Sequence, residues 1–259
     1  MSKSIIGTLK FQKPEADGFD HVAFGDEIEK SVLRNKSDKA FKKKETFSPS
    51  TVGYGHGNCA RYWYIAFEGA EFTDTFTSQG LANMENGTLA HKRIDGYLEG
   101  TGRLVESEVE VKSEDPPIRG YIDAILNWNG EKVIGEVKTA KQEVYDQRRA
   151  SMKPSSNHLL QLLIYMKLTK SRQGVFIYEN KNTQELCLIP ITVNAKYIEI
   201  IDELFAWLRE TRAAWEQKSL PNRAFTKSKP ACKGCPVFDT CWNKLENGDN
   251  IIRAYEPPK

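Results

Sequence analysis

The stretch that decides the fold is Tyr121-Ile-Asp-Ala-Ile-Leu-Asn-Trp-Asn-Gly-Glu-Lys-Val-Ile-Gly-Glu-Val-Lys138. Two runs rich in aliphatic residues stand on either side of Asn129-Gly130. An Asn-Gly dipeptide in this setting is the strongest short signal for a two-residue type I′ turn, because both turn residues need a positive φ. The stretch is therefore predicted to form a β-hairpin in which Trp128 pairs with Glu131.

This register fixes which side chains face each other. Counting back from the turn, Asp123 lies directly opposite Glu136, with Cβ atoms about 4.5–5.5 Å apart. Like charges at this separation destabilise a sheet unless a cation lies between them. Lys138 projects from the same face, two residues beyond Glu136. The three side chains indicate a metal-dependent active site, although a solvated outer face of the hairpin explains them equally well. The opposite face is expected to be apolar, with Ile122, Ala124, Leu126, Val133 and Val137.

Composition bounds the class of protein. The chain has 259 residues, of which 39% are hydrophobic and 28% charged, as in a soluble globular protein built on one large domain. It has no run of about 18 apolar residues and no secretory signal, so we expect a cytoplasmic protein without membrane association. The net charge is only +2. Basic residues nevertheless gather near residues 36–44, 138–153 and 218–233, which suits a polyanionic partner such as DNA or, alternatively, a solvated lysine-rich surface.

Periodicity predicts the remaining elements. Helices are expected near residues 26–34, 60–67, 79–98, 156–169 and 196–218, with Ser155 capping the fourth of these. Further strands are expected at residues 104–111, 173–179 and 185–191. The helix between the Glu136 strand and the Val175 strand implies a crossover and parallel pairing. The prediction is an α/β fold with a mixed sheet flanked by helices, preceded by an irregular charged region over residues 1–50.

Five cysteines in a chain without a secretory signal favour a metal site over a disulfide framework. Cys232, Cys235 and Cys241 supply three closely spaced thiolates, and Cys59 is the remote candidate for a fourth. Zinc and an iron–sulfur cluster would both suit such a set, and His56 is an alternative fourth ligand for zinc. The fifth, Cys187, is expected to be an inert buried side chain.

Four short motifs, taken together, resemble those of the PD-(D/E)XK nuclease superfamily, in particular its RecB-like branch. They are Gly87-x-x-x-His91, Gly120-Tyr-Ile-Asp123, Glu136-Val-Lys138 and Gln161-x-x-x-Tyr165. With the cysteines, the chain resembles the iron–sulfur subset of that branch, which includes CRISPR-associated adaptation nucleases, the AddB nuclease domain and phage-encoded relatives. The resemblance covers residues from about 54 to 245, and the residues before it match no motif.

The resemblance implies a restriction-endonuclease-like fold over residues 51–259, with a C-terminal cysteine-rich region. It also implies a [4Fe–4S] cluster, with zinc as the alternative, held at both ends of this domain by Cys59, Cys232, Cys235 and Cys241. One or two Mg²⁺ or Mn²⁺ ions would be bound by His91, Asp123, Glu136 and the Val137 carbonyl. From the residues alone, His91 would more readily be interpreted as a core histidine of its helix.

The remaining roles are also implied by the resemblance. Lys138 would position or activate the attacking water, or stabilise the transition state. Gln161 and Tyr165 share a helix face and would hold the DNA backbone or keep Lys138 in place. Arg148 and Arg149 would contact phosphates from a polar loop between Lys138 and Ser155.

The function expected is that of a metal-dependent DNA exonuclease acting on single strands or DNA ends in recombination, repair or replication. Its products would carry a 5′-phosphate and a 3′-hydroxyl, and its partners would include DNA and proteins of a recombination or CRISPR-adaptation machinery. Two alternatives remain open. One is overhang trimming or structure-specific endonuclease action, and the other is a non-catalytic scaffold that binds DNA ends.

Overall fold

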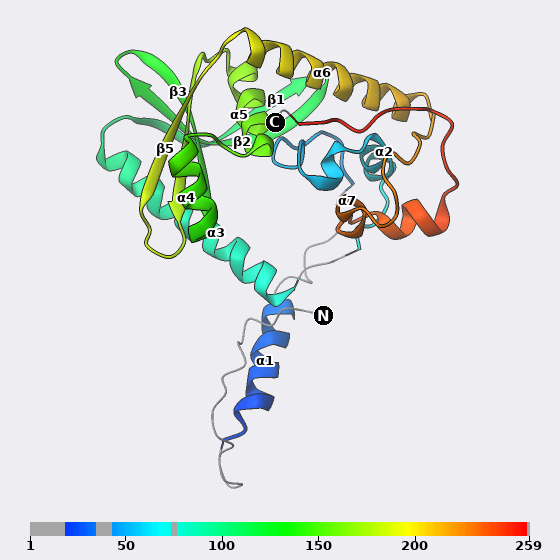
Figure 1. Cartoon of the computed structure of the whole chain (residues 1–259), viewed down its shortest axis with the longest axis horizontal. Helices are drawn as coiled ribbons and strands as arrows, with labels where there is room; N and C mark the ends of the chain where they lie inside the picture. Colours follow the sequence, from blue (N-terminus) through cyan, green and yellow to red (C-terminus); the bar gives the residue numbers. More distant parts are fainter. Residues whose placement is uncertain (1–18, 35–42, 74–76, 258–259) are drawn as a thin grey trace.

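The computed structural model of the chain describes residues 19–34, 43–73 and 77–257. Its centre is a five-stranded mixed sheet in the order β1-β2-β3-β4-β5 (Figure 1). Only β3 and β4 run parallel, and the other neighbouring pairs are antiparallel. The mixed α/β sheet expected from the sequence is confirmed. The strands are β1 Leu104–Glu114, β2 Pro117–Trp128, β3 Glu131–Ala140, β4 Gln173–Asn180 and β5 Leu186–Thr192.

The Asn129-Gly130 turn forms as predicted. Both residues have positive φ, 52° and 87°, and the β2–β3 register runs from Trp128–Glu131 to Ala124–Gly135. The ladder ends at that pair, one step before Asp123 would meet Glu136. Instead, the Val137 N–H donates to Asp123 Oδ2 at 2.7 Å. The two strands therefore diverge at the point where the carboxylates lie.

Helices cover both faces of the sheet. On one face, Ile94 and Leu98 of α3 (Ser78–Gly100) pack against Val137 and Ile177 in a small apolar cluster. The opposite face carries Ile134 and Phe176 in the main core, together with the buried residues of α5 (Ser156–Thr169). Ser155 occupies the N-cap position of α5 as expected, but its side chain makes no capping hydrogen bond.

The polar loop expected between Lys138 and Ser155 is instead a helix, α4 (Gln142–Ser151). Its single buried residue is Tyr145. A helix with one buried position has no apolar periodicity, which is why the sequence pattern missed it.

Beside the sheet, a second part of the molecule is built around α2 (Ala60–Glu68), whose first eight residues are all buried. This helix packs against α6 (Ala195–Glu216), and the C-terminal segment passes beside it (Figure 1). The fully buried guanidinium of Arg61 donates to the carbonyls of Pro221 and Glu246, which fastens α2 to that segment. The short elements here are η1 Gly55–Asn58, α7 Pro230–Lys233 and η2 Thr240–Lys244.

Two pieces precede α2. Helix α1 (His21–Arg34) extends away from the body in Figure 1 and touches α3 through the hydrogen bond from Ser78 Oγ to Glu29, 2.7 Å. Phe47 is fully buried and forms a bridge with Ile118 of β2. This isolated bridge joins the segment around Phe47 to the sheet. Residues 1–18 and 35–42 of the irregular region expected over residues 1–50 lie outside the described residues. No helix in the described ranges combines the length and apolar character that crossing a membrane needs.

Candidate active site

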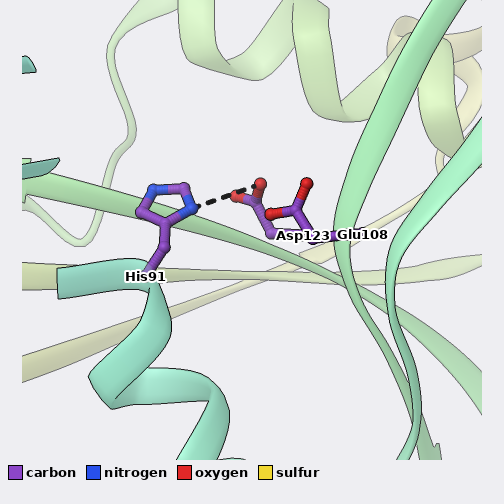
Figure 2. Close-up of side chains that lie close together, drawn as sticks. All are labelled: His91, Glu108 and Asp123. Atoms are coloured by element: carbon purple, nitrogen blue, oxygen red, sulfur yellow. Dashed lines mark ion pairs between the residues drawn. The ribbon is translucent and has the colours of Figure 1, made fainter. Parts of the chain in front are cut away.

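Titratable side chains lie together at the place where the neighbouring strands β2 and β3 diverge. His91 from α3 and Asp123 from β2 approach with Nδ1 and Oδ1 3.5 Å apart. Glu108 from β1 joins them, and one ligand atom from each residue lies within 4.8 Å of the others (Figure 2). The sequence predicted His91 and Asp123 as neighbours, but it did not single out Glu108.

The backbone of β1 is unusual at Glu108. The register of β1 with β2 pairs Ser107 with Ala124 and Val109 with Ile122, so Glu108 stands opposite Asp123. Its φ is +53°, in the left-handed region that a non-glycine residue in a strand rarely adopts. Strained residues of this kind cluster at functional sites, where the surroundings hold them in place. Figure 2 shows the Glu108 carboxylate beside that of Asp123.

Glu136 and Lys138 form a buried ion pair next to this group. The Lys138 Nζ donates to Glu136 Oε1 at 2.6 Å, as their placement on one face predicts. The Glu136 side chain is fully buried, and burial, with the nearby Asp123 charge adding to it, raises its pKa to about 8. Burial alone would lower the pKa of Lys138, but the Glu136 and Asp123 charges outweigh burial and raise it. Lys138 is therefore held in its protonated form.

The donor set suits a hard divalent cation. Glu136 Oε2 is buried and has no hydrogen-bond partner among the described residues. An unpaired buried carboxylate oxygen is costly, and a cation is the partner that would remove this cost. Burial and the nearby Asp123 charge also raise the pKa of Glu108, so a counter-charge would favour the ionised form of this carboxyl. Carboxylates with an imidazole are appropriate ligands for Mg²⁺ or Mn²⁺.

The other predicted residues lie at increasing distance from this centre. Gln161 and Tyr165 are almost fully buried and contact each other, with Gln161 Nε2 3.4 Å from the Tyr165 hydroxyl. Both line a groove that also includes Asp123. Arg148 is near His158 and Tyr178, whose pKa values its charge affects. Arg149 lies near β5, 4.0 Å from Glu185, and is not part of the group.

Melting curves can test whether the carboxylates form one site. Asp123→Asn removes a like charge with little change in shape, so in EDTA it should raise the melting temperature by up to about 3 °C. The same change should remove most of the stabilisation that Mn²⁺ gives the wild type, because a ligand stabilises only through binding to the native state. Glu108→Gln should behave in the same way.

The matched control is Asp249→Asn, which alters an exposed carboxylate outside the group. It should leave both melting curves unchanged. If Asp123→Asn instead melted lower in EDTA and kept the full Mn²⁺ shift, the acids would not share a metal site.

The four cysteines proposed as ligands meet at a second cavity. Cys59 from the start of α2 and Cys232, Cys235 and Cys241 from the C-terminal segment all line it, with His56 and Trp242. All are free thiols. Burial raises the pKa of Cys59 and of Cys232, and it raises that of Cys235 to about 12. Cys187 is buried in β5 and does not line this cavity.

The sulfur of Cys241 accepts a hydrogen bond from Arg61 Nε, which lies 3.2 Å away. The Arg61 guanidinium donates hydrogen bonds to this sulfur and to two backbone carbonyls. None of these three acceptors is a carboxylate that would balance its buried positive charge. A thiolate-bound metal centre would supply that negative charge.

Comparison with known proteins agrees with this site. A mixed sheet whose diverging strands bring an aspartate, a glutamate and a lysine together is typical of a metal-dependent nuclease. The family model of the PD-(D/E)XK nuclease superfamily matches residues 55–242. The chain belongs to that superfamily. No curated protein matches the sequence significantly.

Solved structures with a similar fold include an exonuclease. The crystal structure of an alkaline exonuclease, LHK-Exo, from Laribacter hongkongensis aligns with a TM-score of 0.52 and 14% identity, over 67% of this chain and 91% of that one. LHK-Exo in complex with dAMP aligns with a TM-score of 0.52 and 18% identity, over the same shares of the two chains. At these identities the likeness concerns the fold, which is that of a restriction-endonuclease-like α/β domain.

Proposed function

We propose that this protein is a divalent-metal-dependent deoxyribonuclease that acts as an exonuclease on single strands or DNA ends. The observation that carries the proposal is the group of His91, Glu108 and Asp123 beside the buried Glu136–Lys138 pair. A non-catalytic DNA-binding scaffold has no need of this arrangement, because opposed acids repel DNA phosphates and a buried glutamate destabilises the fold.

The chain's own residues would divide the work of hydrolysis. His91, Glu108, Asp123 and Glu136 would hold the metal, with the Val137 carbonyl as a further ligand. The metal would lower the pKa of a bound water and neutralise charge on the phosphate. Lys138, protonated between two carboxylates, would donate a hydrogen bond to the attacking water or to a phosphate oxygen. The water oxygen bonds to phosphorus as the bond to the 3′ oxygen breaks, which leaves a 5′-phosphate and a 3′-hydroxyl.

We also propose that the cysteine site holds a [4Fe–4S] cluster, as in the iron–sulfur subset of the RecB-like branch. In a tetrahedral zinc site with Zn–S bonds of about 2.3 Å, the sulfurs lie about 3.8 Å apart. No three of the four sulfurs come within 4.8 Å of one another in the described chain. A cluster of four irons accommodates wider spacing. Hydrogen bonds to the sulfurs, such as that from Arg61, are known to tune such clusters.

The resemblance also supports a proposed role in DNA recombination, repair or replication, and the absence of a secretory signal supports a cytoplasmic location. Trimming of overhangs, as in CRISPR adaptation, is the closest alternative because it uses the same chemistry on a different substrate. The two roles differ in the length of their products, and protein partners would differ accordingly.

The experiment is incubation of DNA labelled at its 5′ or 3′ end with Mn²⁺, with Mg²⁺ and with EDTA. We expect cleavage with a divalent cation and none with EDTA, and release of short products from one labelled end. A single internal cut near a strand junction would show that the protein is a structure-specific endonuclease rather than an exonuclease. Binding of DNA ends without cleavage in the presence of any cation would show that it is a non-catalytic scaffold.

A further inference from the structure

A groove leads away from the candidate active site along the N-terminal half of β2. Where β3 has diverged, the exposed side chains of Arg119 and Tyr121 and the half-buried Asp123 form one wall. The other wall consists of Thr46, Ser48, Pro49 and Ser50 and of Gln161 and Tyr165 from α5. A neighbouring hollow continues it over Lys43, Lys44 and Lys112 and shares Arg119 with it; Glu45 and Glu114 also line this hollow. The groove therefore begins at the acids and ends in a hollow where basic side chains outnumber acidic ones.

The floor of the groove is fixed by close packing. Gly120 lies where any Cβ would come within 2.9 Å of the Tyr165 ring and 3.0 Å of Pro49. This close approach packs α5 and the segment around Pro49 against β2. The groove is thus formed by three parts of the chain.

Charge changes sign along the groove. Lys112 of β1 pairs with Arg119 of β2, and Glu110 pairs with Tyr121. Side chains two residues apart on a strand share a face and are about 6.6 Å apart, so Arg119 lies about 13 Å from Asp123. At one phosphate per about 3.4 Å of stacked strand, this distance spans about four nucleotides. The cations thus lie where a strand leaving the acids would present a backbone phosphate.

Hydrogen bonds hold the side chains of Arg119 and Tyr121 in place without cancelling the positive charge of the network. Glu110 accepts from Arg119, from Lys112 and from the Tyr121 hydroxyl, the last at 3.0 Å. Arg119 also donates to the Tyr121 hydroxyl at 3.1 Å. One carboxylate balances only one of the two cations, so the network keeps a net positive charge. Within the described residues, these hydrogen bonds use two of the five N–H groups of Arg119, which leaves three for a ligand.

We propose that this groove binds the single DNA strand that extends from the scissile phosphate, with Arg119 on a backbone phosphate and Tyr121 stacked on an unpaired base. The inference rests on the proposed nuclease function; it selects the single strand among the proposed substrates and names the surface that binds it. Base–aromatic stacking requires unpaired bases, and an arginine next to the ring adds phosphate and cation–π contacts. Tyr121 is suited to this because its ring is 46% exposed while its hydroxyl is hydrogen-bonded to Glu110 and Arg119.

Steady-state cleavage of single-stranded DNA tests the proposal. Arg119→Gln should raise KM about tenfold with kcat retained, since a charge-assisted hydrogen bond is lost, and should reduce the salt dependence of binding by about one counterion. Tyr121→Leu should raise KM by about tenfold or more on single strands, whereas Tyr121→Phe, which keeps the ring, should restore it. The loss in Arg119→Gln should disappear with a dinucleotide, which is too short to reach Arg119.

The matched control is Arg103→Gln. Arg103 lies over the exposed ring of Trp128, 5.2 Å from its centre, at the other end of the same two strands. If Arg103→Gln raised KM as much as Arg119→Gln, the effect would come from surface charge in general, and the proposed binding groove would be wrong. It would also be wrong if KM were unchanged in Arg119→Gln and Tyr121→Leu. If the wild type does not cleave, the proposed function fails. The DNA-binding groove can then be tested separately by measuring how tightly the same variants bind labelled single strands in EDTA, using fluorescence anisotropy.

Discussion

Lys138→Ala should reduce the rate of DNA cleavage about 10²–10⁴-fold, the range that a positioned proton-donating or proton-accepting group contributes. The Lys138 ammonium is 2.6 Å from the buried Glu136 carboxylate, and no other cation is hydrogen-bonded to that carboxylate among the described residues. Its loss therefore removes both a donor to the reacting phosphate or water and the charge that compensates Glu136. Binding of DNA should change only a few-fold, because the basic groove does not include Lys138.

Two further variants keep this prediction decisive. Loss of one partner of a buried ion pair also destabilises a fold, so Lys138→Met, which keeps most of the side-chain volume, should be measured with Lys138→Ala below their melting temperatures. Lys132→Met changes an exposed lysine of the same strand and should leave cleavage unchanged. Near wild-type turnover of Lys138→Met with Mn²⁺ would mean that the reaction occurs elsewhere.

Anaerobically purified protein should be brown and contain about four iron atoms per chain if the cysteine site holds a [4Fe–4S] cluster. Cys235→Ser should bleach it and lower the melting temperature by about 10 °C or more. The reason is topological as well as chemical, because Cys59 and Cys232 are 173 residues apart in the sequence and the centre closes that long loop.

Cys187→Ser is the internal control, since Cys187 is buried in β5 away from the other four cysteines. It should leave the colour and the iron content as in the wild type. A colourless protein with one zinc per chain would replace iron by zinc at this site. Loss of colour in Cys187→Ser, with iron retained in Cys235→Ser, would refute the ligand set.

Much of the candidate site could be predicted because the Asn129-Gly130 turn fixes its own register. Once Trp128 pairs with Glu131, the positions of Asp123 and Glu136 follow by counting. The prediction became inaccurate only at the last pair, where the strands diverge and Asp123 binds the Val137 amide. Tertiary packing causes that divergence, and no local pattern shows it.

Glu108 could not be found in this way. It lies on β1 among alternating acids, with Glu106 and Glu110 on the same face, and the turn between β1 and β2 contains Asp115-Pro116, which is a weaker register signal than Asn-Gly. Any of the three acids could have faced Asp123. The positive φ of Glu108 is set by the folded surroundings and has no signature in a glutamate. Helix α4 was missed because a helix with one buried residue looks like a loop.

The burial of α2 has a consequence for how the protein is made. Residues 60–67 are enclosed partly by residues that follow Pro221, through Arg61 and through the Tyr255 N–H, which donates to the Asn58 carbonyl. At a synthesis rate of about 5–20 residues per second, α2 is synthesised about 8–30 seconds before the residues that follow Pro221. During that time a strongly apolar helix has no complete covering. Helix α6, which also packs against α2, is synthesised before that segment and can provide the first part of the covering.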